Sequence, residues 1–236
     1  MASRVPLDIS PERASSLRRY NVVAGLFHTI QAVAILVLSK SFSLPVFINY
    51  LQDPPIPGAK FERVEVFSFP LATGVALFSI LSALAHFYVS GPGFNKYLAG
   101  LSRKQNYYRW IEYAFSSTLM ILLISMLNAV WDIVALIAIA GVNISMILFG
   151  WLQEKYEEPG KGGSLLPFWF GCIAGITPWI AMFWLLFSPG SSANAPGFVY
   201  GIVFSLFALF NSFAIVQWLQ YKQVGKWADY LAVEKT

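Results

Sequence analysis

The residue in this sequence most able to do chemistry is a single carboxylate within an apolar, aromatic stretch. Glu112 lies in residues 107–115, which also contain Trp110 and Tyr113. A charged side chain in the middle of a membrane helix costs about 2.5–3.5 kcal/mol on insertion scales unless another group compensates it. We therefore expect Glu112 to serve a function that needs its charge.

Three further polar residues occur in apolar segments and could share a site with Glu112. His28 and His86 are the only histidines, and Ser82 precedes His86 by one helical turn, so both face the same way. At about 1.5 Å of rise per residue, His28, His86 and Glu112 lie at similar depth in the inner half of the protein. Each could be satisfied separately by a backbone carbonyl or a water, but their common depth favours a shared site.

Such a site could be a proton relay, a counter-ion site for a buried cation, or a metal site. Metal binding is the weakest of the three, because two histidines and a glutamate on three separate segments show no ligand spacing. We expect no metal.

The elements that position these residues are membrane-spanning helices. The chain has 236 residues, of which 57% are hydrophobic and only 12% charged, which is typical of an integral membrane protein. Six apolar segments are each near the roughly 20 residues that cross a bilayer, and they are too long and continuous for barrel strands. They are residues 21–42, 68–90, 106–127, 131–152, 165–187 and 197–219. The sequence predicts one all-α transmembrane domain, a helical bundle, over residues 1–236.

The distribution of lysine and arginine predicts a cytoplasmic N-terminus in a multi-pass protein of the cell membrane. Thirteen basic residues fall on the side of the N-terminal segment, residues 1–20, and three on the other side, in or beside the loop 43–67. The thirteen are Arg4, Arg13, Arg18, Arg19, Lys96, Arg103, Lys104, Arg109, Lys155, Lys161, Lys222, Lys226 and Lys235; the three are Lys40, Lys60 and Arg63. The positive net charge therefore reflects membrane topology, and we expect no nucleic-acid partner.

The loop 43–67 is predicted to be extracellular and to form a small β-hairpin, because two β-prone runs flank a proline- and glycine-rich turn. Cys172 is the only cysteine, which excludes an internal disulfide. The sequence has no phosphate-binding glycine loop, nucleophile elbow or hydrolase-like carboxylate pair, so we expect no enzyme activity.

The last two segments are rich in aromatic residues that could pack in the core, face lipid or line a pocket for a flat apolar ligand. Gly171 and Gly175 form a small-residue face suited either to a dimer interface or to packing within the chain. We expect a homodimer in the lipid bilayer.

The chain resembles the heliorhodopsins. The resemblance rests on Trp-Ile-Glu-Tyr at 110–113, Ser-Ala-Leu-Ala-His at 82–86, His28, and the run from Phe-Asn-Ser-Phe-Ala at 210–214 to Gly-Lys-Trp-Ala-Asp-Tyr-Leu at 225–231. It implies a rhodopsin-like seven-helix photoreceptor that holds all-trans retinal as a protonated Schiff base on a lysine of helix seven. It also implies the inverted orientation that the charges predict.

By position, the resemblance assigns roles to eleven residues. Glu112 resembles the counter-ion of the Schiff base, which would supply the missing cationic partner. The polar cavity beside it would comprise His28, Ser82, His86, Asn106, Trp110 and Tyr113. The retinal pocket would include Met120, Asn143, Trp169 and Phe210. Six spans are present, and the segment 229–235 matches the part of the family that leads into helix seven. We therefore expect that helix, with the retinal lysine, to follow residue 236.

The favoured function is light sensing with Schiff-base proton transfer into the inner polar cavity and signalling to an unknown cytoplasmic partner. One alternative is a light-driven pump or light-gated proton conductance. Pumping is disfavoured because Glu112 is the only acidic residue well inside a predicted span. Another alternative is a light-independent membrane scaffold that binds lipid or a carotenoid.

Overall fold

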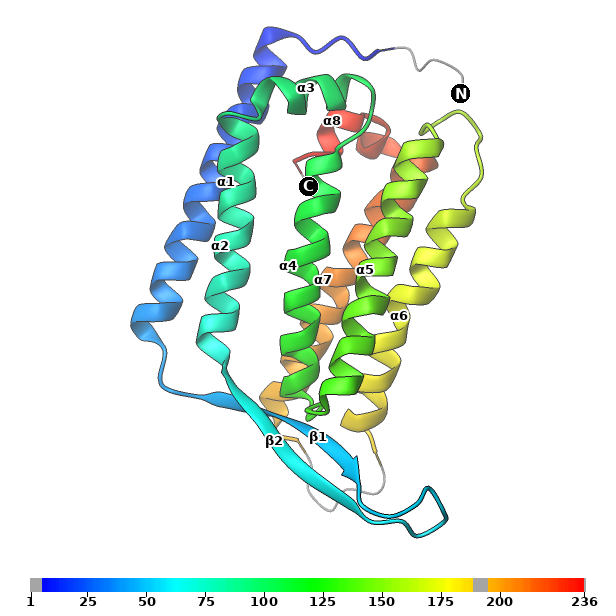
Figure 1. The fold of residues 1–236 in the computed structure, drawn as a ribbon. Helices are drawn as coiled ribbons and strands as arrows, with labels where there is room; N and C mark the ends of the chain where they lie inside the picture. The colour runs from blue at the N-terminus through cyan, green and yellow to red at the C-terminus, as the bar shows by residue number, and fades with distance from the viewer. Residues whose placement is uncertain (1–5, 189–194, 236) are drawn as a thin grey trace.

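Six long helices dominate the computed structural model, which describes residues 6–188 and 195–235 (Figure 1). They are α1 (Pro11–Leu38), α2 (Leu71–Ser90), α4 (Tyr107–Leu127), α5 (Ile133–Tyr156), α6 (Leu166–Leu186) and α7 (Gly197–Tyr221). Each is long and apolar enough to cross a membrane. The predicted helical bundle is confirmed, with α1 beginning at Pro11 rather than at residue 21. Ser10 explains the early start, because its Oγ accepts a hydrogen bond from Arg13 N at 3.3 Å and proline follows at the first helical position.

The helices pack as a curved row in which sequence neighbours are also neighbours in space. α2 packs between α1 and α4, α5 packs between α4 and α6, and α7 lies beside α6 (Figure 1). Of the six, α7 is the least buried within the described residues. Most of its apolar surface therefore remains outside the packed interior of this chain.

Short elements mark the two ends of the bundle (Figure 1). The helix α3 (Phe94–Ser102), the 3-10 helix η1 (Gly225–Ala228) and α8 (Tyr230–Val233) lie at the end where α1 begins. We call this the terminal end. Leu17, Tyr97 and Leu101 form a buried cluster there with Tyr230 and Leu231. The C-terminal segment that contains η1 and α8, which we call the tail, is thus folded onto the bundle.

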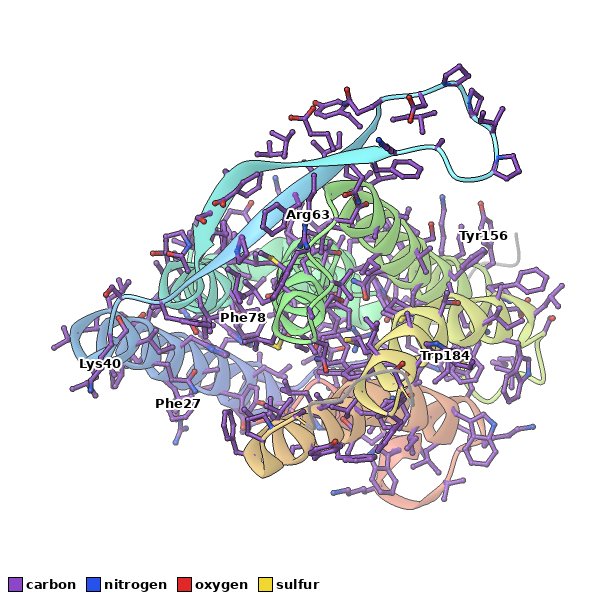
Figure 2. All side chains as sticks on the ribbon, turned by 90° about the horizontal axis from the view of Figure 1, so that it is seen from below. Phe27, Lys40, Arg63, Phe78, Tyr156 and Trp184 are labelled. Atoms are coloured by element: carbon purple, nitrogen blue, oxygen red, sulfur yellow. The ribbon has the colours of Figure 1, made fainter. Side chains whose placement is uncertain are left out.

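The opposite end, the hairpin end, carries an antiparallel pair of strands, β1 (Ser43–Leu51) and β2 (Phe61–Pro70). The loop predicted to form a hairpin does so, with Ser43 opposite Pro70 and a register shift after Val46. Leu44 and Val46 are buried in a cluster with Met126 and Leu136 of the helices. Figure 2, seen from below, shows the hairpin extending along one side of the bundle.

The small-residue face of α6 is used within the chain. A Cβ added at Gly171 would lie 3.3 Å from Phe149 Cβ, and one added at Gly175 would overlap Met146. Both neighbours belong to α5, so these glycines permit close α5–α6 packing. The dimer alternative for this face therefore has no support from its packing.

A similar close approach joins α4 and α5, where the Trp110 ring lies against Gly150. A Cβ at Gly150 would overlap this ring, whereas a Cβ at Gly141, in the same helix, would meet nothing within 4 Å. We expect Gly150→Ala to destabilise the protein by about 1–3 kcal/mol through overpacking. Gly141→Ala is the matched control and should leave stability unchanged or slightly higher. The measurement is the midpoint of thermal unfolding in detergent; equal midpoints for the two variants would contradict this packing.

Candidate functional site

The carboxylate of Glu112 lies between α4 and α2. Ser82 Oγ of α2 donates a hydrogen bond to Glu112 Oε1 at 2.7 Å. Ser82 is buried, and Glu112 is partly buried one turn beyond Arg109 on α4. No ion pair involves Glu112 among the described residues. The site therefore holds an acidic group without a cationic partner.

The two histidines lie together between α1 and α2. The rings of His28 and His86 are stacked with centroids 5.6 Å apart, and His86 Nδ1 lies 2.8 Å from Asn21 Oδ1. Asn21 Nδ2 donates to the Leu17 carbonyl, so its Oδ1 is free to accept from His86 Nδ1–H. His28 Nδ1 is buried without a hydrogen-bond partner in the described structure. This atom can accept or hold a proton.

Asn21 was missed as a site residue by the sequence analysis, although a signal existed. It precedes His28 by seven residues, which places both on one face of α1 after two helical turns. A polar residue on that face of an otherwise apolar helix indicates a contribution to the same site.

A second polar cluster, at the terminal end, is built around Arg109. Its guanidinium pairs with Glu154 of α5 at 2.9 Å and with Glu234 of the tail at 3.1 Å. Glu154 also accepts hydrogen bonds from Trp110 Nε1 and from the Tyr230 hydroxyl. We call Arg109, Glu154, Glu234 and Tyr230, with Asn106 and Trp110, the tail network. It joins α4 and α5 to the C-terminal segment.

Two residues predicted to belong to the polar cavity contact the tail network instead. Asn106 caps α4, donates its backbone N–H to Glu154 at 3.1 Å and its side-chain amide to Glu234 at 2.5 Å. Trp110 is held by Glu154. The described hydrogen bonds of the Asn106 and Trp110 side chains therefore go to the tail network, and none joins them to Ser82 or Glu112.

The remaining predicted residues are Tyr113, Asn143, Met120, Phe210 and Trp169, and the structure does not bring all five together. Tyr113 packs edge-on against Phe213 of α7, and Asn143 Nδ2 donates to Ser117 and Thr118 at 2.9 Å. Met120 and Phe210 belong to an apolar cluster around Trp179. Trp169 is 53% exposed and contacts Phe168, so the structure does not bring it to this cluster.

The tail network has two carboxylates for one guanidinium, and this imbalance bears on the pKa of the carboxyl of Glu234, which lies outside the spans. Burial raises the pKa of the Glu234 carboxyl above its ordinary value of 4.5, Arg109 opposes this rise, and Glu154 adds to it. Burial also raises the pKa of the Tyr97 and Tyr230 hydroxyls. Glu234 therefore holds a proton more tightly in the folded protein than in the unfolded chain.

These features define a class: a multi-pass helical membrane protein with an internal polar site suited to a buried cation. The heliorhodopsin family model matches residues 17–236, and the chain belongs to the heliorhodopsin family. No curated protein matches the chain. The family is one of retinal-binding, light-sensing membrane proteins.

The described residues fit a retinal chromophore. Glu112 lacks a cation and His28 Nδ1 lacks a partner, so both could face a positively charged, proton-carrying group. The cluster that contains Met120, Trp179 and Phe210 offers an apolar aromatic wall for a polyene. Retinal would bring visible-light absorption and a change of shape to this site.

The raised pKa of Glu234 predicts a pH-dependent stability. Because the folded carboxyl binds its proton more tightly, the unfolding free energy contributed by Glu234 should rise as pH falls from its raised pKa towards 4.5. Glu234→Gln should abolish this gain. Arg109→Gln removes the cation that opposes the rise in the pKa of Glu234, so the gain in unfolding free energy should begin at higher pH. This substitution also breaks a buried ion pair, which should lower the free energy of unfolding by about 3–5 kcal/mol.

The measurement is the unfolding midpoint of the three proteins across this acidic range in one detergent. The difference between the unsubstituted protein and Glu234→Gln should change with pH. A constant difference would contradict the inference.

Proposed function

We propose that this protein is a light sensor in which Glu112 is the counter-ion of an all-trans retinal chromophore and in which the response is signalling rather than ion pumping. The observation that carries the proposal is the Glu112 carboxylate, hydrogen-bonded to Ser82 and without a cationic partner in the described structure. An ionised carboxylate in a low-dielectric site needs such a partner. A cationic chromophore would meet that need.

The surrounding residues suit the handling of one proton. Ser82 Oγ fixes the Glu112 carboxylate by its hydrogen bond. We assign His28 Nδ1 as the atom that accepts the proton released by the Schiff base. This nitrogen is buried without a hydrogen-bond partner, and its ring stacks on His86. Asn21 holds the His86 ring by accepting from Nδ1. His86 can therefore keep its orientation when the charge at His28 changes.

The distribution of acidic residues supports signalling over pumping. In the half of each span nearer the hairpin, the described helices contain no aspartate or glutamate within their bounds. A proton pump needs carriers towards both faces of the membrane, and the acidic residues within these spans lie only in the halves nearer the terminal end. The excess of basic residues at that end supports a cytoplasmic location for it.

The tail network offers a route from the site to the surface. Arg109 precedes Glu112 by three residues on α4, so the two side chains leave neighbouring turns of one helix. Arg109 in turn pairs with Glu234 in the tail. A displacement of α4 near Glu112 would therefore move the tail, which we propose presents the signal to a cytoplasmic partner.

Glu112→Gln tests the counter-ion role. A nearby carboxylate stabilises the positive charge at the nitrogen end of the chromophore in the dark, so its removal should lower the excitation energy. The absorption maximum of the retinal-bound protein should move to longer wavelength.

The matched control is Glu62→Gln, which removes an exposed carboxylate from β2 and should leave the spectrum unchanged. Ser82→Ala should give a smaller shift than Glu112→Gln, since it removes one hydrogen bond and keeps the charge. If Glu112→Gln absorbs at the same wavelength as the unsubstituted protein, the counter-ion role is wrong.

A further inference from the structure

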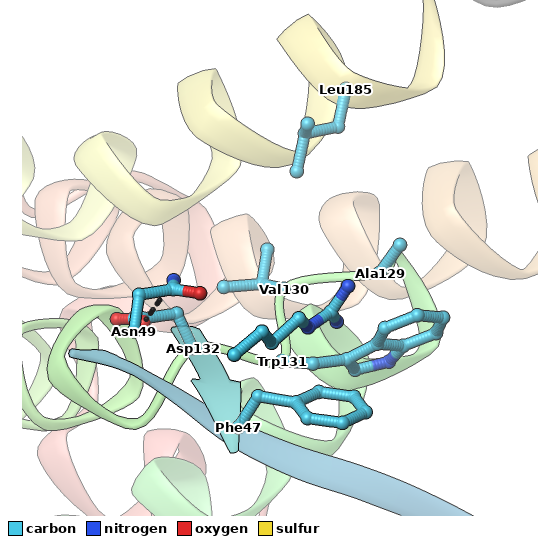
Figure 3. Close-up of a pocket in the computed structure, with 8 residues that line it drawn as sticks. Phe47, Asn49, Ala129, Val130, Trp131, Asp132 and Leu185 are labelled. Atoms are coloured by element: carbon cyan, nitrogen blue, oxygen red, sulfur yellow. Dashed lines mark hydrogen bonds between the residues drawn. The ribbon is translucent and has the colours of Figure 1, made fainter. Parts of the chain in front are cut away.

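A pocket lies between the β-hairpin and the ends of the helices, away from the site described above. Its volume is about 250 Å³. Its lining includes Phe47 and Asn49 of β1, Arg63 of β2, Trp131 and Asp132 before α5, and Leu185 of α6 (Figure 3). The hairpin is fixed over this junction because Phe47 N donates to the Trp131 carbonyl at 2.8 Å.

Arg63 provides a positive charge whose hydrogen-bond donors are not used. Its guanidinium carbon lies 3.8 Å from the centre of the Phe47 ring and 5.9 Å from that of Trp131, so the group makes cation–π contacts with both rings. No hydrogen bond or ion pair joins the guanidinium of Arg63 to another group among the described residues. Figure 2 shows Arg63 between the hairpin and the helices. A guanidinium in such contacts keeps N–H groups available to an oxyanion.

Asp132, the acidic residue in the lining, forms no ion pair with Arg63. Its Oδ1 accepts from Ala135 N at 3.0 Å and its Oδ2 from Asn49 Nδ2 at 3.2 Å (Figure 3). Asp132 is thus committed to capping α5 and holding β1. Its negative charge would oppose a multiply charged anion more strongly than one with a single negative charge.

The depth of the pocket indicates where such an anion would come from. α4 ends at Leu127, α5 begins at Ile133 and α6 ends at Leu186, so the pocket lies at the ends of three helices that are long and apolar enough to cross a membrane. Lipid phosphates occupy this level of a bilayer. Leu185 is 46% exposed and presents an apolar surface beside the pocket, where an acyl chain could lie.

We infer that this pocket binds the phosphodiester of a phospholipid in the leaflet at the hairpin end, and that the guanidinium of Arg63 donates hydrogen bonds to it. A phosphodiester carries one negative charge, and two of its oxygens match the planar fork of a guanidinium. The bound lipid would join the hairpin to α5 and α6.

Native mass spectrometry of the detergent-solubilised protein can test this inference. The probes are dioleoyl phosphatidylglycerol and, as a matched ligand without phosphate, dioleoylglycerol. The phospholipid should bind more tightly than the diacylglycerol. Arg63→Gln should weaken phospholipid binding about tenfold, as expected for loss of a charged hydrogen bond, and leave diacylglycerol binding unchanged.

The matched control variant is Lys60→Gln, which removes an exposed cation just before β2 but outside the pocket lining and should bind as the unsubstituted protein does. Arg63→Lys keeps the charge without the fork and should show an intermediate affinity, which keeps the test valid if Arg63→Gln loosens the hairpin. Equal phospholipid affinity in all four proteins would overturn the inference. Dimethyl phosphate is a soluble phosphodiester with one negative charge. If millimolar dimethyl phosphate displaced the phospholipid from the pocket, the pocket would be a soluble-anion site, which would overturn the lipid assignment.

Discussion

One electrostatic constraint governs this protein: a carboxylate removed from water must have its charge compensated. Glu112 accepts a hydrogen bond from Ser82 and has no cation as a partner among the described residues. Arg109, one turn away, is not available, since both of its terminal amino groups pair with Glu154 and Glu234. The tail network thus engages both terminal amino groups of Arg109 and leaves Glu112 to another cation.

The two polar clusters place different demands on the fold. The site at Glu112 is formed by contacts of α2 with α1 and with α4, and these helices follow one another closely in the sequence. The tail network instead joins residues far apart in the chain, such as Arg109 and Glu234, and keeps the tail against the bundle. Its closeness to Glu112 along α4 would let a change of charge at the site reach the terminal surface.

Much of the bundle could be predicted from hydropathy, because each span must be long and apolar. The pairing of Ser82 with Glu112 and of His28 with His86 agrees with the predicted helix faces and depths. The tail network could not be predicted, because it depends on tertiary packing. Glu154 lies just beyond the apolar segment that was predicted to end at residue 152. Nothing in the local sequence indicates that Glu234 forms an ion pair with Arg109. For the same reason Asn106 and Trp110 were expected beside Glu112 but contact Glu154.

The central claim is that Glu112 is ionised in the dark and compensates a cationic chromophore. The most direct test is to measure the protonation state of Glu112 in the dark. Infrared difference spectra between the retinal-bound protein and its Glu112→Gln variant, with and without ¹³C-labelled glutamate, would report the protonation state of this side chain. We predict that the variant loses the bands of an ionised carboxylate. Loss of the carbonyl stretch of a protonated carboxyl group would instead show that Glu112 is neutral and compensates no cation, which would contradict the account.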